Sequence, residues 1–258
     1  MNTSATRWPV AVLGATGAVG QAFIRLLDGH PLFDLVEVAA SERSAGKSYR
    51  DAAKWLEGPL RASVAGLTVK ACTPDEVTAP IVFSALDSGV AGEVEAAFAK
   101  AGRLVLSNAK NYRMAADVPL VIPEVNGDHL GMLAQQRALR GWAGGIVTNA
   151  NCATTVIAAA LAPLHERFQV TKVFATTMQA VSGAGYPGVP SLDILGNVIP
   201  YIGDEEPKIE TELGKLLGRY DGQQIVPADI VVSAHANRVP VEHGHTVCLS
   251  VGFATKPT

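Results

Sequence analysis

The first third of the chain alternates short apolar runs with amphipathic stretches. Apolar runs of strand length occur at residues 9–13, 35–40, 67–71, 81–86 and 104–106. A helical pattern of apolar positions fills residues 18–27, between the first two runs. This alternation is typical of βαβ units, in which helices cover both faces of a parallel sheet. It predicts an α/β dinucleotide-binding fold over residues 1–145.

The pattern changes after residue 126. A polar stretch over residues 129–140 and the pair Gly144-Gly145 are interpreted as a domain boundary. From Ile146 onward the pattern predicts a strand, a helix (153–168), a strand (173–180), a Gly- and Pro-rich loop (182–190), a helix (205–217) and a strand pair around Val239 and Val247. We therefore expect a second, mixed α/β domain over residues 146–258. The chain stops just after the alternating run 246–253, so this domain is expected to be truncated at its C-terminus.

Composition narrows the classes of partner. Of the 258 residues 48% are hydrophobic, enough for a packed core, and the net charge of −3 provides no basic field for nucleic acid. The chain begins without a leader pattern and contains no run of about 18 apolar residues, so we expect no membrane contact and a cytoplasmic location. Three widely spaced cysteines without a CxxC pair indicate neither a disulfide framework nor a metal site.

A glycine-rich segment follows the first predicted strand and opens a helix. It reads GATGAVG. Gly14 permits a tight turn, Gly17 lets the backbone approach a pyrophosphate, and Gly20 allows close packing of helix and strand. The segment predicts a dinucleotide cofactor bound by Gly14, Thr16, Gly17, Ala18, Val19 and Gly20. The alternative is a tight turn without a ligand.

The end of the second predicted strand indicates which dinucleotide binds. An NAD site usually has an acid there, whereas this chain reads ASERSAGK. Arg43 can fork onto a 2′-phosphate and Ser41 and Ser44 can donate to it, which favours NADP. A solvated basic loop is the alternative, because Glu42 lies close. None of the five tyrosines has a lysine four residues later, which excludes the short-chain dehydrogenases.

A cysteine in NANCATT is the strongest candidate nucleophile. Asn151 is a good N-cap, which places Cys152 in the first helical turn, where free N–H groups and the helix dipole stabilise a thiolate. Cys72 and Cys248 are interpreted as buried apolar residues of strands. The segment RVPVEHGH adds a cation and two imidazoles, and with the cofactor motif this indicates hydride transfer to or from a thioester. On their own, Glu205 and Lys208 are typical of an exposed helix start.

Taken in order, these segments resemble one enzyme family along nearly the whole chain. They are GATGAVG, ASERSAGK, SNAKNYRM, IPEVN, NANCATT, MQAVSGAGYPGVPSLDILGNVIPYI, GDEEPKIETE and RVPVEHGHT. The family is aspartate-semialdehyde dehydrogenase in its archaeal and fungal form. The resemblance implies a Rossmann-type domain followed by a catalytic and dimerisation domain. It also implies NADPH-dependent reductive dephosphorylation of L-aspartyl 4-phosphate through a cysteine thioester, in lysine, threonine and methionine biosynthesis, by a homodimer or homotetramer.

The resemblance implies a role for each matching residue. Cys152 matches the nucleophile, His245 the acid/base histidine, Gln179 the glutamine that positions the acyl group, Arg238 the ligand of the substrate α-carboxylate, Glu205 the partner of its α-amino group, Lys208 and Arg113 the phosphate ligands, and Ser182 and Gly183 the turn beside the nicotinamide. His243 and Asn149 have weaker claims. This charge set complements an amino-dicarboxylate carrying a phosphate.

Three alternatives remain at this point. A malonyl-CoA reductase or an N-acetylglutamyl-phosphate reductase has similar chemistry on the same scaffold, but neither substrate has a free α-ammonium, so neither explains Glu205. A non-catalytic NADP-binding module is the alternative from another class.

Overall fold

The computed structural model describes residues 6–257. Residues 1–5, which belong to the N-terminal segment expected to lack a leader, and Thr258 lie outside the described range. The chain divides into two compact units, Met1–Tyr112 with Leu133–Thr148, and Arg113–Met132 with Asn149–Thr258. The division at residues 145/146 stays a prediction. Segment 113–132, which precedes that boundary, packs with the second unit.

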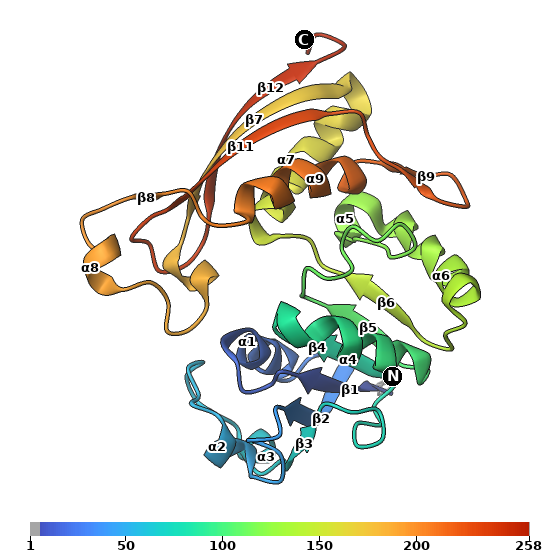
Figure 1. Cartoon of the computed structure of the whole chain (residues 1–258), viewed down its shortest axis with the longest axis vertical. Coiled ribbons are helices and arrows are strands. Elements are labelled where there is room, and N and C mark those ends of the chain that lie inside the picture. The colour runs from blue at the N-terminus through green and yellow to red at the C-terminus, as the bar shows by residue number, and fades with distance from the viewer. Residues whose placement is uncertain (1–5, 258) are drawn as a thin grey trace, which may run out of the picture. The chain divides into compact units, whose positions relative to one another are not determined.

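The first unit contains a six-stranded parallel sheet (Figure 1). Its strands are β1 (Trp8–Leu13), β2 (Phe33–Ala40), β3 (Val69–Ala71), β4 (Ile81–Ser84), β5 (Leu104–Ser107) and β6 (Gly145–Thr148). Its helices are α1 (Ala18–Leu27), α2 (Tyr49–Ala52), α3 (Ala62–Ala65), α4 (Ser88–Lys100) and most of α6 (Met132–Arg140). The strand order β3-β2-β1-β4-β5-β6 is that of the Rossmann fold, which confirms the expected fold class.

The turn after β1 lies where the strand order reverses. Gly14 has a φ of +71°, and a Cβ at this position would lie 2.5 Å from the carbonyl oxygen of Ala85, just beyond β4. Only glycine tolerates both conditions. In sheets of this order the reversal point is where dinucleotides bind, so the fold puts the GATGAVG turn at the expected place.

The polar stretch over residues 129–140 is helical, and the side chains of Gln136 and Arg137 bond to the backbone. A 3₁₀ turn, Gly127–Gly131, leads into α6. Gln136 is fully buried, donates to the carbonyl oxygen of Ile146 at 3.0 Å and accepts from its N–H at 2.7 Å. The polarity that suggested a boundary therefore serves to attach this helix to β6.

The second unit is built on a mixed four-stranded sheet in the order β12-β7-β11-β8 (Figure 1). These strands are β7 (Val170–Gln179), β8 (Ile199–Pro200), β11 (Val231–Arg238) and β12 (Thr246–Phe253). The remaining elements are α5 (Pro123–Asn126), α7 (Cys152–Phe168), a 3₁₀ turn (Val181–Ala184), α8 (Ser191–Ile194), α9 (Glu205–Leu216) and the hairpin of β9 (Arg219–Tyr220) and β10 (Ile225–Val226). Apolar side chains of α7 and α9 pack on one face of the sheet and form the core of this unit.

The expected strand pair around Val239 and Val247 is wrong. β11 pairs in parallel with β7, and β12 pairs with the other edge of β7 in antiparallel orientation. The connection passes over the end of β7, where Val239 N–H donates to the carbonyl of Gln179 and Val181 N–H donates to that of Val241. Nearness in sequence suggested that the two strands pair with each other, but the longest strand of the sheet lies between them.

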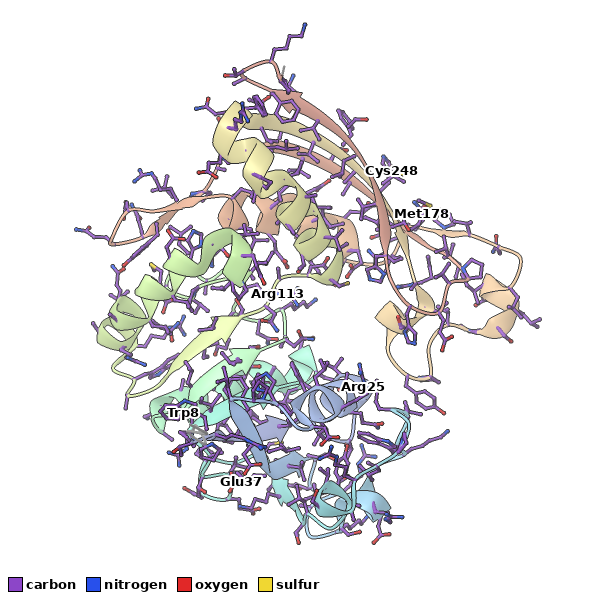
Figure 2. All side chains as sticks on the ribbon, turned by 180° about the vertical axis from the view of Figure 1, so that it is seen from behind. Trp8, Arg25, Glu37, Arg113, Met178 and Cys248 are labelled. Atoms are coloured by element: carbon purple, nitrogen blue, oxygen red, sulfur yellow. The ribbon has the colours of Figure 1, made fainter. Side chains whose placement is uncertain are left out.

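The second face of this sheet is open in the chain. Exposed and buried residues alternate along β7, so Lys172, Phe174 and Thr176 are exposed. Cys248 lies opposite Thr176 on this face, and Figure 2 labels it beside Met178. The expectation that Cys248 is buried is therefore wrong, because it points away from α7 and α9. Among residues 6–257, no helix is both long and apolar enough to cross a membrane.

A buried carboxylate on β2 ties a loop to the first sheet. Glu37, labelled in Figure 2, accepts from the ammonium of Lys70 at 2.6 Å and from the N–H groups of Thr78 and Ala79 at 2.9 and 2.8 Å. Burial alone raises the pKa of Glu37, but these hydrogen bonds outweigh it and leave the pKa below its ordinary value. A lowered carboxyl pKa in the folded state stabilises the fold above the pKa of the unfolded chain.

We expect Glu37→Gln to cost about 1–3 kcal/mol of unfolding free energy at pH 7, because the amide cannot accept all of these bonds. The difference from wild type should shrink as the pH falls below about 4, where the wild-type carboxylate also becomes protonated. Urea unfolding at several pH values measures both effects. Glu57→Gln, which breaks a surface pair with Arg25, is the control and should cost under about 1 kcal/mol. Equal losses in the two variants contradict the prediction.

Candidate active site

The glycine-rich turn of the first unit is held in shape by buried side chains. The hydroxyl of Tyr49 donates to the carbonyl of Ala15 at 2.8 Å, and the side chain of Gln21 donates to that of Thr16 at 3.0 Å. Gly17 is the N-cap of α1 and, having no side chain, leaves the first N–H groups of the helix uncapped. Gly17 and Val19 are exposed, Gly14, Thr16 and Ala18 are partly exposed, and Gly20 is buried. This turn suits an anionic pyrophosphate.

The predicted 2′-phosphate ligands follow β2. Ser41 and Arg43 are exposed and Ser44 is half-buried. A turn in which Ser44 N–H donates to the carbonyl of Ser41 at 2.8 Å holds the segment. The carboxyl ends of β1 and β2 are neighbours, so these residues and the GATGAVG turn lie at the same edge of the sheet. The residues present therefore fit a phosphorylated dinucleotide.

The candidate nucleophile stands at the start of α7, as predicted. The side-chain oxygen of Asn151 accepts from the N–H groups of Ala153 and Thr154 at 3.0 and 3.1 Å. This cap fixes Cys152 as the first residue of the helix, with its side chain exposed.

His245 reaches the thiol from the connection between β11 and β12. Its Nε2 lies 3.2 Å from the Sγ of Cys152. Its Nδ1 accepts from the N–H of Ala180 at 3.1 Å, and a backbone N–H can only donate. The neutral ring therefore carries its proton on Nε2, and His245 is oriented to donate toward the thiol or toward an atom bound beside it.

The start of α7 lowers the pKa of the Cys152 thiol, as expected, but other groups outweigh it and the net pKa is raised. The protein atoms packed around Cys152 raise the pKa of its thiol, and the carboxylate of Glu205 raises it further. The N–H groups of the first turn and the guanidinium of Arg113 lower it by less. Local position predicted only the helix contribution, because the Glu205 carboxylate comes from a distant part of the chain.

Glu205 begins α9 but is half-buried rather than exposed, with only 12% of its side chain exposed. One oxygen accepts from Lys208 at 2.7 Å. The other accepts from the amides of Asn151 at 2.9 Å and Gln179 at 3.3 Å. Burial alone raises the pKa of Glu205, but these bonds outweigh it and lower the pKa, so the group stays ionised.

Arg238 and the turn at Gly183 complete the surroundings of the histidine. Arg238 is buried at the end of β11 and donates to the carbonyl of Ala180 at 2.8 Å. Burial lowers its pKa, while the nearby Glu205 and Cys152 raise it. A Cβ on Gly183 would lie 2.8 Å from a guanidinium nitrogen of Arg238 and 3.2 Å from the ring of His245. Gly183 and the neighbouring Ser182 therefore line the same site, in the second unit.

Arg113, labelled in Figure 2, is buried and paired with a carboxylate that the sequence did not single out. Its guanidinium donates to Glu212 at 3.0 Å, and the other oxygen of Glu212 accepts the N–H of Asn151 at 2.6 Å. Lys215 donates to the backbone carbonyl of Arg113 at 2.7 Å. Glu212 and Lys215 lie seven and ten residues after Glu205, which puts them on the same face of the helix, and this spacing was the sequence pattern that could have identified them.

Two weaker candidates are both exposed. His243 is exposed and its ring lies 3.5 Å from the exposed carboxylate of Glu242. Asn149 is exposed, two residues before the cap of α7. Within residues 6–257, no group of three or more His, Cys, Asp or Glu side chains is arranged to hold a metal ion.

Comparisons with known proteins agree along nearly the whole chain. Residues 9–133 match the family model described as "Semialdehyde dehydrogenase, NAD binding domain", and residues 161–258 match "Semialdehyde dehydrogenase, dimerisation domain". The aspartate-semialdehyde dehydrogenase of Archaeoglobus fulgidus is 52% identical over 96% of this chain and 72% of its own length. That of Schizosaccharomyces pombe is 48% identical over the same shares.

The solved structures give the same result. The aspartate-semialdehyde dehydrogenase of Candida albicans, determined with NADP, matches with a TM-score of 0.89 at 43% identity, over 98% of this chain and 73% of that one. Both family models, the close relatives and the fold agree. The chain therefore belongs to the aspartate-semialdehyde dehydrogenase family.

Proposed function

We propose that this chain catalyses the NADPH-dependent reductive dephosphorylation of L-aspartyl 4-phosphate to L-aspartate 4-semialdehyde through a thioester on Cys152. The observation that carries the proposal is the placement of the thiol, 3.2 Å from the imidazole of His245, at the centre of the charged network of Glu205, Arg113 and Arg238. The family membership supports the same reaction.

NADP is the cofactor that the first unit fits. The uncapped start of α1 and the close approach of Gly14 to Ala85 suit a pyrophosphate, and the exposed Arg43 suits a 2′-phosphate. The Candida albicans relative was solved with NADP. When bound, the reduced cofactor supplies a hydride. We propose Gly14, Thr16, Gly17, Ala18, Val19, Gly20, Ser41, Arg43, Ser44, Ser182 and Gly183 as its contacts.

The first chemical step is acyl transfer to the thiol. The Sγ of Cys152 bonds to the acyl carbon, the bond from that carbon to the phosphate oxygen breaks, and inorganic phosphate leaves. The thiol loses its proton and the phosphate gains one, so the step is balanced. The Nε2–H of His245 donates to the acyl oxygen that becomes negative during the attack. In this tautomer His245 therefore acts as an acid rather than as a base.

The second step reduces the thioester. A hydride adds to the acyl carbon, the carbon–sulfur bond breaks, and the aldehyde leaves with Cys152 as a thiolate that then takes up a proton. The Nε2–H of His245 points at Sγ and stabilises this thiolate. Gln179, whose amide bonds to Glu205, is proposed to orient the acyl group.

The substrate charges complement the site. Arg238 is proposed to bind the α-carboxylate, Arg113 and Lys208 the phosphate, and Glu205 the α-ammonium. An ammonium bound at Glu205 offsets the negative charge that raises the pKa of Cys152, so substrate binding helps to activate the thiol. Malonyl and N-acetylglutamyl substrates lack this ammonium, which favours the aspartyl substrate.

The product class suggests a role in lysine, threonine and methionine biosynthesis, with a cytoplasmic location.

We further propose a homodimer, or a homotetramer built from it, through the open face of the second sheet. The matched dimerisation model covers β7, β11 and β12. Phe174 is 61% exposed on this face, although a large aromatic side chain is better buried.

The direct test of the proposed function is the reverse reaction. Protein incubated with aspartate semialdehyde, phosphate and NADP should generate NADPH, observed by absorbance at the wavelength of the reduced nicotinamide. Cys152→Ser should abolish the signal. No absorbance rise beside an active control enzyme contradicts the proposal, whereas binding of NADPH without turnover points to a non-catalytic module.

Cofactor choice is tested at Arg43. Arg43→Ala removes one or two charge-assisted hydrogen bonds, worth about 1.5–3 kcal/mol each, so NADP binding should weaken roughly 10- to 100-fold while NAD binding hardly changes. The loss should be smaller at high salt, because an exposed phosphate contact is screened. Titration with both cofactors measures it, with Arg50→Ala, also exposed, as the control. Equal weakening of NAD and NADP means that Arg43 shapes the loop instead.

The influence of Glu205 on the thiol is tested by alkylation. Glu205→Gln removes a negative charge that raises the pKa of Cys152, so the rate of iodoacetamide labelling of Cys152 should begin to rise at lower pH than in wild type. Peptide mapping by mass spectrometry distinguishes Cys152 from Cys72 and Cys248. The control is Glu206→Gln, whose carboxylate accepts from the N–H of Ala236 instead. Identical pH profiles in all three proteins contradict the assignment.

A further inference from the structure

Helix α9 carries two further charged residues, Glu212 and Lys215, beyond Glu205 and Lys208, which are assigned to the substrate. Glu205, Lys208, Glu212 and Lys215 are spaced by three, four and three residues, which puts them on one face of the helix. Glu212 is only 2% exposed and Lys215 only 6%. Buried charges are costly unless they are closely paired, so the contacts of these two residues need an explanation.

Glu212 joins two segments of the site with its two oxygens. Oε1 accepts from the guanidinium of Arg113 at 3.0 Å, and Oε2 accepts from the N–H of Asn151 at 2.6 Å. Arg113 is the proposed phosphate ligand, and Asn151 caps the helix that begins with Cys152. A single carboxylate therefore bonds both to the group that would hold the leaving phosphate and to the residue before the nucleophile.

Lys215 holds the same arginine from its backbone. Its ammonium donates to the carbonyl oxygens of Arg113 at 2.7 Å, Ala115 at 2.8 Å and Val118 at 2.7 Å. An ammonium has three N–H donors, and each has an acceptor here. Residues 113–118 contain no helix or strand, so these bonds set the course of that segment. Burial lowers the pKa of Lys215 to about 8.

We propose that Glu212 and Lys215 are positioning residues, which hold the phosphate-binding guanidinium of Arg113 at a set distance from the thiol of Cys152. The inference rests on the proposed function. An acyl phosphate is attacked at the carbon next to its bridging oxygen, so the phosphate ligand and the nucleophile must be held in register with each other. Arg113 and Cys152 are 39 residues apart in sequence, and Glu212 bridges them through Asn151.

A merely structural role predicts a different outcome. In that case, loss of the carboxylate lowers the fraction of folded protein and reduces the rate in proportion, without a selective effect on phosphate. A positioning role predicts weaker phosphate binding beside a thiol that is still present. Phosphate affinity therefore separates the two, and it can be measured without turnover.

The experiment compares Glu212→Gln with wild type in a phosphate protection assay. Inorganic phosphate bound at Arg113 should slow the alkylation of Cys152 by iodoacetamide. In Glu212→Gln the amide cannot accept from both Arg113 and Asn151, so the phosphate concentration for half-protection should rise roughly tenfold or more. In the reverse assay the KM for phosphate should rise by a similar factor, while the KM for the semialdehyde stays within about twofold.

Glu210→Gln is the matched control. Glu210 lies on the same helix and accepts one backbone N–H, from Ala234 at 3.2 Å, which an amide oxygen can also accept. The proposal is overturned if the phosphate concentration for half-protection is the same in Glu212→Gln and Glu210→Gln. It is also overturned if phosphate does not protect the wild-type thiol. If Glu212→Gln fails to fold, Glu212→Asp keeps both oxygens on a shorter side chain and should weaken phosphate in the same direction. Absent turnover in wild type refutes only the proposed function, because protection does not require it.

Discussion

The site depends on one residue, Asn151, whose polar groups are bonded to two helices, α7 and α9. Its side-chain oxygen caps α7, its side-chain amide donates to Glu205 and its backbone N–H donates to Glu212. Its carbonyl accepts from the N–H of Thr155 inside the helix. The start of α7, and with it the thiol, is thereby tied to one face of α9. Because Glu205 and Glu212 belong to the same helix, the proposed substrate contacts on α9 are linked to the nucleophile through Asn151.

The electrostatics of the site keep the thiol of Cys152 protonated until a substrate binds in the proposed mechanism. A cysteine at a helix start is usually activated, yet the packed surroundings and the carboxylate of Glu205 raise the pKa of Cys152. His245 does not reverse this as a base, because its Nδ1 accepts from Ala180 and its proton stays on Nε2. The Glu205 carboxylate, which disfavours the thiolate of Cys152, is also the proposed partner of the substrate ammonium. In the proposed mechanism, activation of the thiol and recognition of the substrate are thus coupled through the charge of Glu205.

The second sheet explains why these groups come together. β7 lies between β11 and β12, and the connection from Arg238 to His245 passes over the end of β7. Gln179, Arg238 and His245 therefore gather at one end of neighbouring strands, and the lack of a side chain on Gly183 lets Arg238 and His245 approach the turn. The open face of the second sheet, with Lys172, Phe174 and Thr176, takes no part in the site.

The sequence by itself determined what depends on neighbouring residues. The alternation of strands and helices gave the parallel sheet, and the GATGAVG turn and the Asn151 cap placed the candidate cofactor turn and the thiol, because backbone periodicity, φ and capping are local properties. Only the tertiary structure decided the pairing of β12 with β7, the exposure of Cys248, the raised pKa of Cys152 and the burial of Glu212 and Lys215. Each of these depends on contacts with segments far away in sequence, as between Glu212 and Arg113, and no local pattern records which segments those are.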